Sequence, residues 1–282
     1  MRRMLLVVVA LSVPFAAPRA APSAPRAVPS APRAVPSATP SPAASAAPSA
    51  VRDVGTWSAD PGQAPAARDA AAWREKGDVV RRLFANAGVA FPPDRLLFRV
   101  FKQESLLEVW ADGGHGAGAG RAARVATYEV CRMSGAAGPK RRAGDMQVPE
   151  GFYRVEVLNS ASRFHLSMGI GYPNASDRVL SDRRAPGGAI MIHGACASIG
   201  CIAMGDDRIR ELWVMASAMW RADRRTDVHV FPARDTAALA ADASDPALRR
   251  FWGDLAEGLR RFETTGRIPR VTVGPDGRYG FR

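Results

Sequence analysis

The chain has 282 residues, which allows one large domain or two small ones. Its 39 lysines and arginines outnumber its 27 aspartates and glutamates, so the formal net charge is +12. No basic stretch alternates with aromatic residues as a single-strand binder requires, and we therefore expect no nucleic-acid partner. The charge suits an anionic envelope polymer, or equally a well-solvated surface.

Residues 1–23 have the pattern of a secretory signal. The chain opens on MRRM, and an almost uninterrupted apolar run follows from Leu5 to Ala17. This run is too short to span a bilayer comfortably, and Pro14 argues against an ordinary buried helix. We therefore expect export to the periplasm, with membrane contact only through the signal during export. No clean cleavage motif marks the end of the signal.

Residues 24–60 are predicted to form a disordered tether. The segment PSAPRAV occurs twice in succession from Pro22 to Val35, and PSATPSPAASAAPSA follows. Proline, alanine and serine in this proportion cannot bury a core, and the prolines favour extended conformations. Such a tether would let an exported domain search a surface, unless it is a remnant without function.

Residues 61–92 are predicted to be helical, and residues 93–282 to form one domain. Apolar residues recur at helical spacing between Asp69 and Asn86, and a glycine turn at 88 ends the helix. Short β-branched and aromatic runs predict strands at residues 97–101, 106–111, 125–131, 152–158, 164–168 and 189–193. The polar KQES between the first two runs is typical of a hairpin.

Two loops rich in glycine and proline, at residues 134–151 and 169–188, are long enough that we expect them to line a site. The glycine-rich segment 113–120 is predicted to be a loop, and it lacks the strand-to-helix setting of a phosphate-binding loop.

Two helices are predicted in the last third of the chain. Asp206 or Asp207 is expected to cap the first, and Asp245-Pro246 opens the second. The residues expected to be buried are Ile209, Leu212, Trp213, Ala216 and Trp220 in the first helix, and Leu248, Trp252, Leu255, Leu259 and Phe262 in the second. Many short strands and few helices predict a mainly β domain with helical additions.

The segment HGACASIGCIAM, residues 193–204, holds one of the four histidines and two of the three cysteines. A zinc site would use His193, Cys196 and Cys201, but no second pair of closely spaced ligands supplies the fourth. A Cys196–Cys201 disulfide would close a small, strained loop, whereas a Cys131–Cys196 bridge is easier and leaves Cys201 free. Since three cysteines cannot all pair within the chain, we predict the Cys131–Cys196 bridge.

The third interpretation is a cysteine nucleophile with its base. His193 lies at the end of a predicted strand, and Cys201 returns after a short turn, so the two can face each other. A nearby imidazole would lower the pKa of the thiol and make thiolate available near neutral pH. Gly200 allows close approach of a substrate, and N–H groups around residues 199–201 can point at an oxyanion. Spacing alone does not decide among the three interpretations.

The motif resembles the active site of the L,D-transpeptidase catalytic domain (YkuD-like) family, and most closely its YafK-like branch. Ile192-His193-Gly194 and Ser198-Ile199-Gly200-Cys201 supply its apolar-His-Gly and Ser-x-Gly-Cys elements. FRVFKQESLLEVW, SGAAGPKRRAGDMQVPEGFY and SRFHLSMGIGYPNASDR are also similar, so the resemblance runs from about residue 97 to at least 232. It implies a β-sandwich or barrel with flanking α-helices, working without a cofactor or metal in cell-wall biogenesis and cell shape.

The resemblance also implies a role for each residue of the motif. Cys201 would be the nucleophile that attacks L-to-D bonds of murein stem peptides, with His193 as general base and acid. The Gly194 carbonyl would orient the imidazole. The main-chain amides of Ile199, Gly200 and Cys201 would form the oxyanion hole, and Ser198 would brace the turn or touch the substrate. Further candidate substrate contacts are Arg163, His165 and Tyr172, each of which can instead be a packing or surface residue.

Two departures from the family pattern bear on the outcome of the reaction. Ala203 stands where most members carry an arginine, and the stretch between His193 and Cys201 is short. Both favour hydrolysis (as an L,D-endopeptidase or amidase) over cross-linking, and the YafK-like branch includes members that cut murein–lipoprotein links. Arg163, Arg183 or Arg184 could replace the missing guanidinium. The alternative function is a non-catalytic envelope-binding module with a structural Cys/His cluster.

Overall fold

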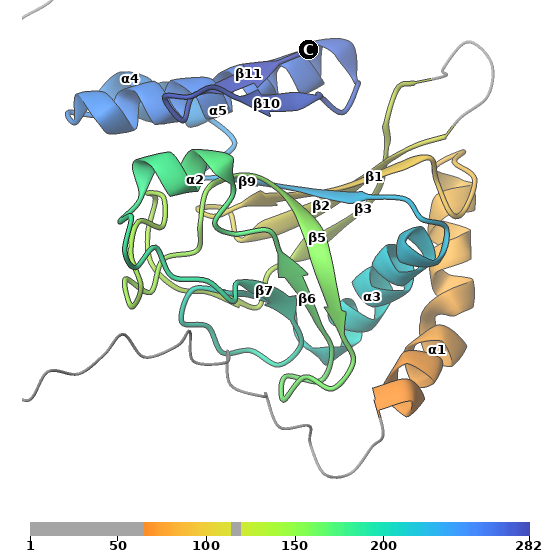
Figure 1. Ribbon diagram of the computed structural model, residues 1–282. Helices are drawn as coiled ribbons and strands as arrows, with labels where there is room; N and C mark the ends of the chain where they lie inside the picture. Colours follow the sequence, from red (N-terminus) through yellow and green to blue (C-terminus); the bar gives the residue numbers. More distant parts are fainter. Residues whose placement is uncertain (1–64, 114–119) are drawn as a thin grey trace, which may run out of the picture. The chain divides into compact units, whose positions relative to one another are not determined.

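The computed structural model describes residues 65–113 and 120–282 (Figure 1). The predicted signal and tether, the first residues of the 61–92 segment and most of the glycine-rich 113–120 loop lie outside the described residues. None of the helices in the described part is both long and apolar enough to cross a membrane.

The described chain folds around a nine-stranded sheet of order β3-β2-β1-β9-β5-β6-β7-β8-β4. The strands are β1 Arg95–Phe101, β2 Leu106–Asp112, β3 Ala123–Glu129, β4 Arg132–Met133, β5 Gly151–Asn159, β6 Ser167–Ile170, β7 Met191–His193, β8 Ile202–Ala203 and β9 Thr226–Phe231. The fold is mainly β with flanking helices, as predicted. The β1–β2 hairpin is also confirmed, with Phe101 opposite Leu106.

The sheet differs from the sequence prediction chiefly in three strands that were not predicted and in the start of β6. The prediction missed β4, β8 and β9, and β9 lies at the centre of the sheet, parallel to β1 and antiparallel to β5. The predicted strand 164–168 was wrong in its first half, since β6 begins at Ser167. His165 has a φ of 67°, a left-handed conformation that interrupts any strand at that point.

Helices α1 Pro65–Asn86 and α3 Asp206–Arg221 lie side by side against the sheet (Figure 1). Ala72, Val80 and Phe84 of α1 belong to the same buried core as the apolar face of α3, which confirms the α1 prediction. The cap predicted for α3 was wrong, because its N-cap is Gly205, which has no side chain to offer. Trp220 was also predicted wrongly, since it is 53% exposed.

A second apolar cluster lies between the sheet and the C-terminal elements α4 Thr236–Asp242, α5 Pro246–Thr265 and the hairpin of β10 Val271–Val273 with β11 Tyr279–Phe281 (Figure 1). Asp245 caps α5 as predicted, because its carboxylate accepts the N–H of Ala247. Within α5, a Cβ at Gly258 would lie 2.5 Å from the Phe152 ring, so only glycine allows this close packing. The sequence prediction did not include α4 or the hairpin.

The short helix α2 Ala175–Leu180 occupies part of the predicted 169–188 loop. Asn174 and Asp177 form a reciprocal capping box at its start, in which each side chain accepts the other residue's main-chain N–H. The cap helps fix the segment that follows β6, and residues of this segment line a large groove.

Candidate active site

The parallel pair β7 and β8 positions the two residues of the motif. His193 ends β7, and the chain turns through residues 194–201 before it enters β8, where Ala203 pairs with His193. His193 and Cys201 line one small cavity of about 30 Å³. Its other lining residues are Asn159, Ser162, Phe164, Ser167, Ala189 and Met191. The structure therefore brings together the two residues that the sequence proposed as nucleophile and base.

Close packing fixes the turn at its first glycine. A Cβ at Gly194 would lie 2.7 Å from both the Asp206 carboxylate and the Phe164 carbonyl, so no other residue fits. The same carboxylate accepts the N–H of Ala195 at 2.7 Å. Asp206 thus stabilises the turn instead of capping α3, which explains the failed cap prediction. At the other end of the turn, Gly200 has a φ of 127°, which side-chain-bearing residues rarely adopt.

The predicted Cys131–Cys196 disulfide is present, and its two Cα atoms are 5.5 Å apart. It joins the turn to the residue before β4 and leaves Cys201 as a free thiol. Because Cys196 is oxidised, it cannot serve as a zinc ligand, which removes the metal interpretation of the motif. In the described ranges, no group of three or more potential ligands is placed to hold a metal ion.

Removing this bridge in a Cys131→Ser/Cys196→Ser variant is expected to lower the free energy of unfolding by about 4 kcal/mol, because the bridge spans 65 residues of the unfolded chain. Urea unfolding with and without reductant measures the loss. The pairing itself is checked by counting free thiols in the denatured, unreduced protein. One free thiol is expected, and three would show that the bridge does not form.

Ser198 lies at the centre of a hydrogen-bond network inside the turn. Its Oγ accepts the N–H groups of Gly200 at 3.3 Å, Cys201 at 3.1 Å and Ser134 at 3.2 Å, and it donates to the Cys201 carbonyl at 2.7 Å. Of the two roles considered for Ser198, the free protein shows the bracing one. The network also engages two of the three amides proposed for the oxyanion hole, and the third residue, Ile199, is exposed.

The geometry of His193 defines its tautomer. The ring is buried, and Nδ1 lies 2.6 Å from the Gly194 carbonyl oxygen. Because a carbonyl oxygen only accepts hydrogen bonds, Nδ1 must carry the proton, and Nε2 is left with its lone pair. Burial lowers the pKa of His193, although the bond to Gly194 opposes this effect. His193 is therefore a neutral imidazole at pH 7, with a basic nitrogen available for a proton.

Burial also dominates the chemistry of Cys201. It raises the pKa of the thiol, and a main-chain hydrogen bond from Met191 and the charge of Lys140 only partly counter it. The expectation that the imidazole would lower this pKa was wrong, because desolvation of the thiolate outweighs the influence of a neutral ring. In the free protein Sγ donates to the Ala189 carbonyl at 3.8 Å.

Lys140 was not among the site residues predicted from the sequence; it lies in the first of the two long loops. The side chain is buried, and it donates to Asp145 at 2.6 Å and to the Arg142 carbonyl at 2.8 Å. The Lys140–Asp145 ion pair stabilises this loop. The loop packs against the 194–201 turn, since a Cβ at Gly200 would lie 3.3 Å from the Gln147 carbonyl oxygen. The spacing of Lys140 and Asp145 is the only sequence signal, and many surface ion pairs share it.

The candidate substrate contacts do not line the cavity. Arg163 is exposed, and its neighbours Ser162 and Phe164 do line it. His165 lies in a turn with its buried Nε2 unpartnered, and burial lowers its pKa. Tyr172 is buried and donates to the Pro186 carbonyl at 2.9 Å; burial raises its pKa to about 12.

Ala203 is fully buried in β8. Its methyl side chain offers no hydrogen-bond donor to a substrate carboxylate.

Comparisons with known proteins indicate the family of the chain. The family model described as the L,D-transpeptidase catalytic domain matches residues 96–230, a range that includes His193 and Cys201. The Escherichia coli K12 protein named "Putative L,D-transpeptidase YafK" is 35% identical over 184 residues, which are 64% of this chain and 71% of the relative.

Solved structures resemble the chain more distantly. The helical cell shape determining protein Pgp2 of Campylobacter jejuni has a TM-score of 0.40 and 16% identity, covering 71% of this chain and 80% of that one. L,D-transpeptidase 1 of Mycobacterium tuberculosis has a TM-score of 0.26 and 14% identity, covering 49% and 62%.

Proposed function

This chain belongs to the L,D-transpeptidase catalytic domain family, and from that premise we propose that it is a cysteine acyl-transferase acting on peptidoglycan stem peptides. The observation that carries the proposal is the cavity that His193 and Cys201 share. We further propose that the protein is exported to the periplasm, where such peptides are accessible. A murein-linked lipoprotein is a second proposed substrate.

The proposed reaction begins from a neutral Cys201–His193 pair. As Sγ attacks the carbonyl carbon at an L-to-D bond, Nε2 of His193 takes the thiol proton. The C–N bond then breaks, and the imidazolium returns the proton to the departing amine, which leaves a thioester on Cys201. An amine or water attacks this thioester, His193 again takes the proton, and the thiol is regenerated. The Gly194 carbonyl holds the ring in the required tautomer throughout.

The proposed oxyanion hole consists of the main-chain amides of Ile199, Gly200 and Cys201. In the free protein the last two donate to Ser198 Oγ. We propose that the substrate oxygen replaces the hydroxyl as their acceptor when negative charge develops on it. An exchange of this kind favours the transition state over the ground state, because an oxyanion is a stronger acceptor than a neutral hydroxyl.

We propose that water is the preferred acceptor of the acyl group. Holding an acceptor amine in place requires a group that binds its carboxylate, and buried Ala203 offers none. Arg163 is the first candidate replacement, because its chain neighbours Ser162 and Phe164 line the cavity. Arg183 and Arg184 are further candidates, exposed in the second long loop.

Incubating the enzyme with stem tetrapeptides and an excess of a free D-amino acid is therefore expected to yield more hydrolysed product than exchanged product. Mass spectrometry of the products separates the two outcomes. Efficient D-amino-acid exchange with little hydrolysis would contradict the preference for water while leaving the Cys201 chemistry intact. An Arg163→Gln variant tests the replacement guanidinium, because it should reduce whatever exchange occurs.

A further inference from the structure

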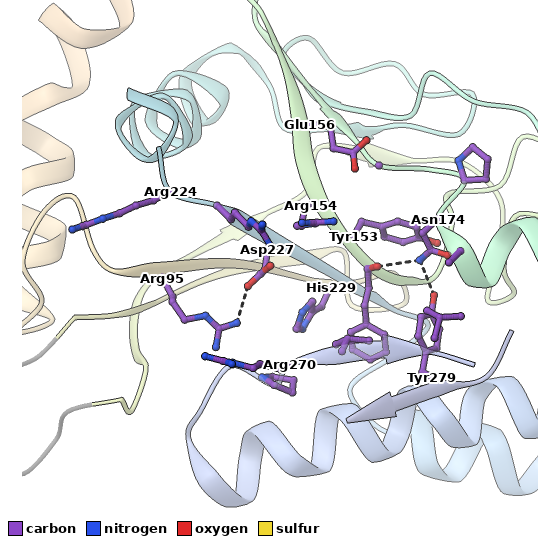
Figure 2. Close-up of a pocket in the computed structure, with 18 of the residues that line it drawn as sticks. Arg95, Tyr153, Arg154, Glu156, Asn174, Arg224, Asp227, His229, Arg270 and Tyr279 are labelled. Atoms are coloured by element: carbon purple, nitrogen blue, oxygen red, sulfur yellow. Dashed lines mark hydrogen bonds and ion pairs between the residues drawn. The ribbon is translucent and has the colours of Figure 1, made fainter. Parts of the chain in front are cut away.

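A groove of about 810 Å³ lies apart from the Cys201 cavity, and no residue lines both (Figure 2). Strands β1, β5 and β9 contribute to it, together with the start of α2 and the segment that leads into β10. Its charged lining residues are Arg95, Arg154, Arg178, Arg224, Arg225 and Arg270, with Asp94, Glu156 and Asp227. A hollow of this size is in the range of small-ligand sites.

Two of the six arginines are neutralised by carboxylates of the groove itself. Arg95 pairs with Asp227 at 3.0 Å, and Arg224 with Asp94 at 3.3 Å. The other four are exposed, and within the described residues their guanidinium groups make no ion pair or hydrogen bond; they are Arg154, Arg178, Arg225 and Arg270. Figure 2 shows Arg154 and Arg270 on different elements around the same hollow. The groove therefore has an excess of positive charge available to a ligand.

One carboxylate of the groove is also available. Glu156 is exposed on β5 and makes no ion pair within the described residues. A Cβ at Gly171 would lie 2.5 Å from its Oε1, so the glycine leaves room for this carboxylate against the neighbouring backbone. A ligand carrying only negative charge would be repelled here, whereas an ammonium group would be attracted.

One part of the groove is lined by aromatic rings that are held by ring contacts and hydrogen bonds. The Phe152 and Tyr279 rings meet edge to face at 4.8 Å. Asn174 donates from Nδ2 to the Phe152 carbonyl at 3.0 Å and to the Tyr279 hydroxyl at 2.9 Å, as the dashed lines of Figure 2 indicate. His229 adds no charge to the groove, because burial lowers its pKa to about 3. The aromatic part of the groove is thus held in place by hydrogen bonds before any ligand binds.

We propose that this groove binds a short peptide that carries several carboxylates and at least one free ammonium group. The four available guanidinium groups suit carboxylates through paired, charge-assisted hydrogen bonds, and Glu156 suits the ammonium group. A phosphate polymer fits less well, because it has no cation to offer Glu156. The groove is separate from the site of the proposed reaction, since none of its lining residues lines the Cys201 cavity.

Isothermal titration of the full chain carrying Cys201→Ala, which prevents turnover, tests the proposal. The probe is a synthetic tetrapeptide with a blocked N-terminus, two free side-chain carboxylates, a free C-terminus and one lysine amine as its only ammonium group. An Arg225→Gln/Arg270→Gln variant is expected to weaken binding at least about tenfold, because two charge-assisted contacts are lost. The matched control is Arg74→Gln/Arg82→Gln, which removes the same charge from exposed arginines of α1 that lie outside the groove and the Cys201 cavity, and it should bind as the parent does.

Two further comparisons define the ligand chemistry. Acetylating the lysine amine of the probe should weaken binding to the parent but not to a Glu156→Gln variant. Inorganic polyphosphate should bind more weakly than the peptide. Equal weakening by the two double variants, no effect of acetylation, or tighter polyphosphate binding would each overturn the proposal. Failure of the proposed reaction would show separately, as a wild-type protein that leaves murein peptides unchanged.

Discussion

Replacing Cys201 or His193 with alanine is expected to reduce turnover of murein peptides by at least about 10³-fold while the fold remains intact. Each substitution removes one half of a unit that works together: without Sγ no acyl-enzyme forms, and without the imidazole no group takes the thiol proton. Combining the two substitutions should cost little more than either one alone, since the unit has already failed. Mass analysis of a peptidoglycan digest measures the turnover, and circular dichroism checks the fold.

The matched control for this experiment is Cys196→Ser, which changes the other sulfur of the motif. It should weaken the protein but retain most of its activity, because Cys196 is bonded to Cys131 and does not line the cavity. A His193→Asn variant keeps an amide N–H at the δ position, where it can still donate to the Gly194 carbonyl, so its loss of activity can be attributed to the missing base. Full activity in Cys201→Ala would refute the assignment.

The thiol itself distinguishes an enzyme from a purely structural binding module. Because burial raises the pKa of Cys201, its alkylation should become faster as the pH rises, with no plateau near neutrality. If the imidazole of His193 takes the thiol proton, Cys201 in the His193→Ala variant should be alkylated more slowly than in the parent. A thiol that does not react in the folded protein at any pH would favour the envelope-binding module.

Local signals in the sequence were enough to predict much of this fold. The β1–β2 hairpin connects consecutive strands across a short polar turn, and α5 begins at an Asp245-Pro246 pair whose capping chemistry is contained in two residues. Strand β9 was missed although TDVHVF is a reasonable strand sequence, because its role at the centre of the sheet depends on pairing with β1 and β5. The two-residue strands β4 and β8 are too short for any periodic signal, and only their pairing defines them.

Some features of the candidate site could likewise be predicted from local sequence, and others depend on the fold. His193 and Cys201 could be predicted because they lie in one compact motif, and the cysteine count pointed to the Cys131–Cys196 bridge. Lys140 could not, because its charge reaches Cys201 only through the packing of a distant loop. The direction of the thiol pKa was predicted wrongly for a related reason: a sequence shows which groups are neighbours in the chain, whereas desolvation depends on the whole surrounding fold.

Disrupting the buried charge network around Glu108 is expected to have the second large effect. This effect is on the free energy of unfolding and not on catalysis. Glu108 of β2 is fully buried and accepts hydrogen bonds from Arg99 at 2.6 and 2.9 Å, from the Trp110 indole at 2.8 Å and from Arg234 at 2.5 Å. Burial alone would raise the pKa of this carboxyl, but the hydrogen bonds and the charge of Arg99 outweigh it, and the pKa is lowered. Arg99 is equally buried and also pairs with Glu263 at 2.6 Å.

Removing one partner of this pair leaves the other charged and buried. Glu108→Leu and Arg99→Met are therefore each expected to lower the free energy of unfolding by about 3–5 kcal/mol, measured by urea denaturation. Because the folded pKa of Glu108 is lowered, its stabilising contribution is present above the ordinary carboxyl pKa and is lost as the pH falls through the folded value. The cost of Glu108→Leu should accordingly shrink in acid.

The double variant Arg99→Met/Glu108→Leu should cost much less than the sum of the two single ones. Apolar side chains of similar volume replace a pair whose desolvation consumes most of its attraction. The outer partners can adapt, since the side chains of Arg234 and Glu263 are 44% and 56% exposed and can be hydrated. Activity per folded molecule should stay at the parental level, because none of these residues lines the Cys201 cavity. Single variants that cost less than about 1 kcal/mol, or a double variant that costs the full sum, would show that the two charges are not coupled in the folded protein.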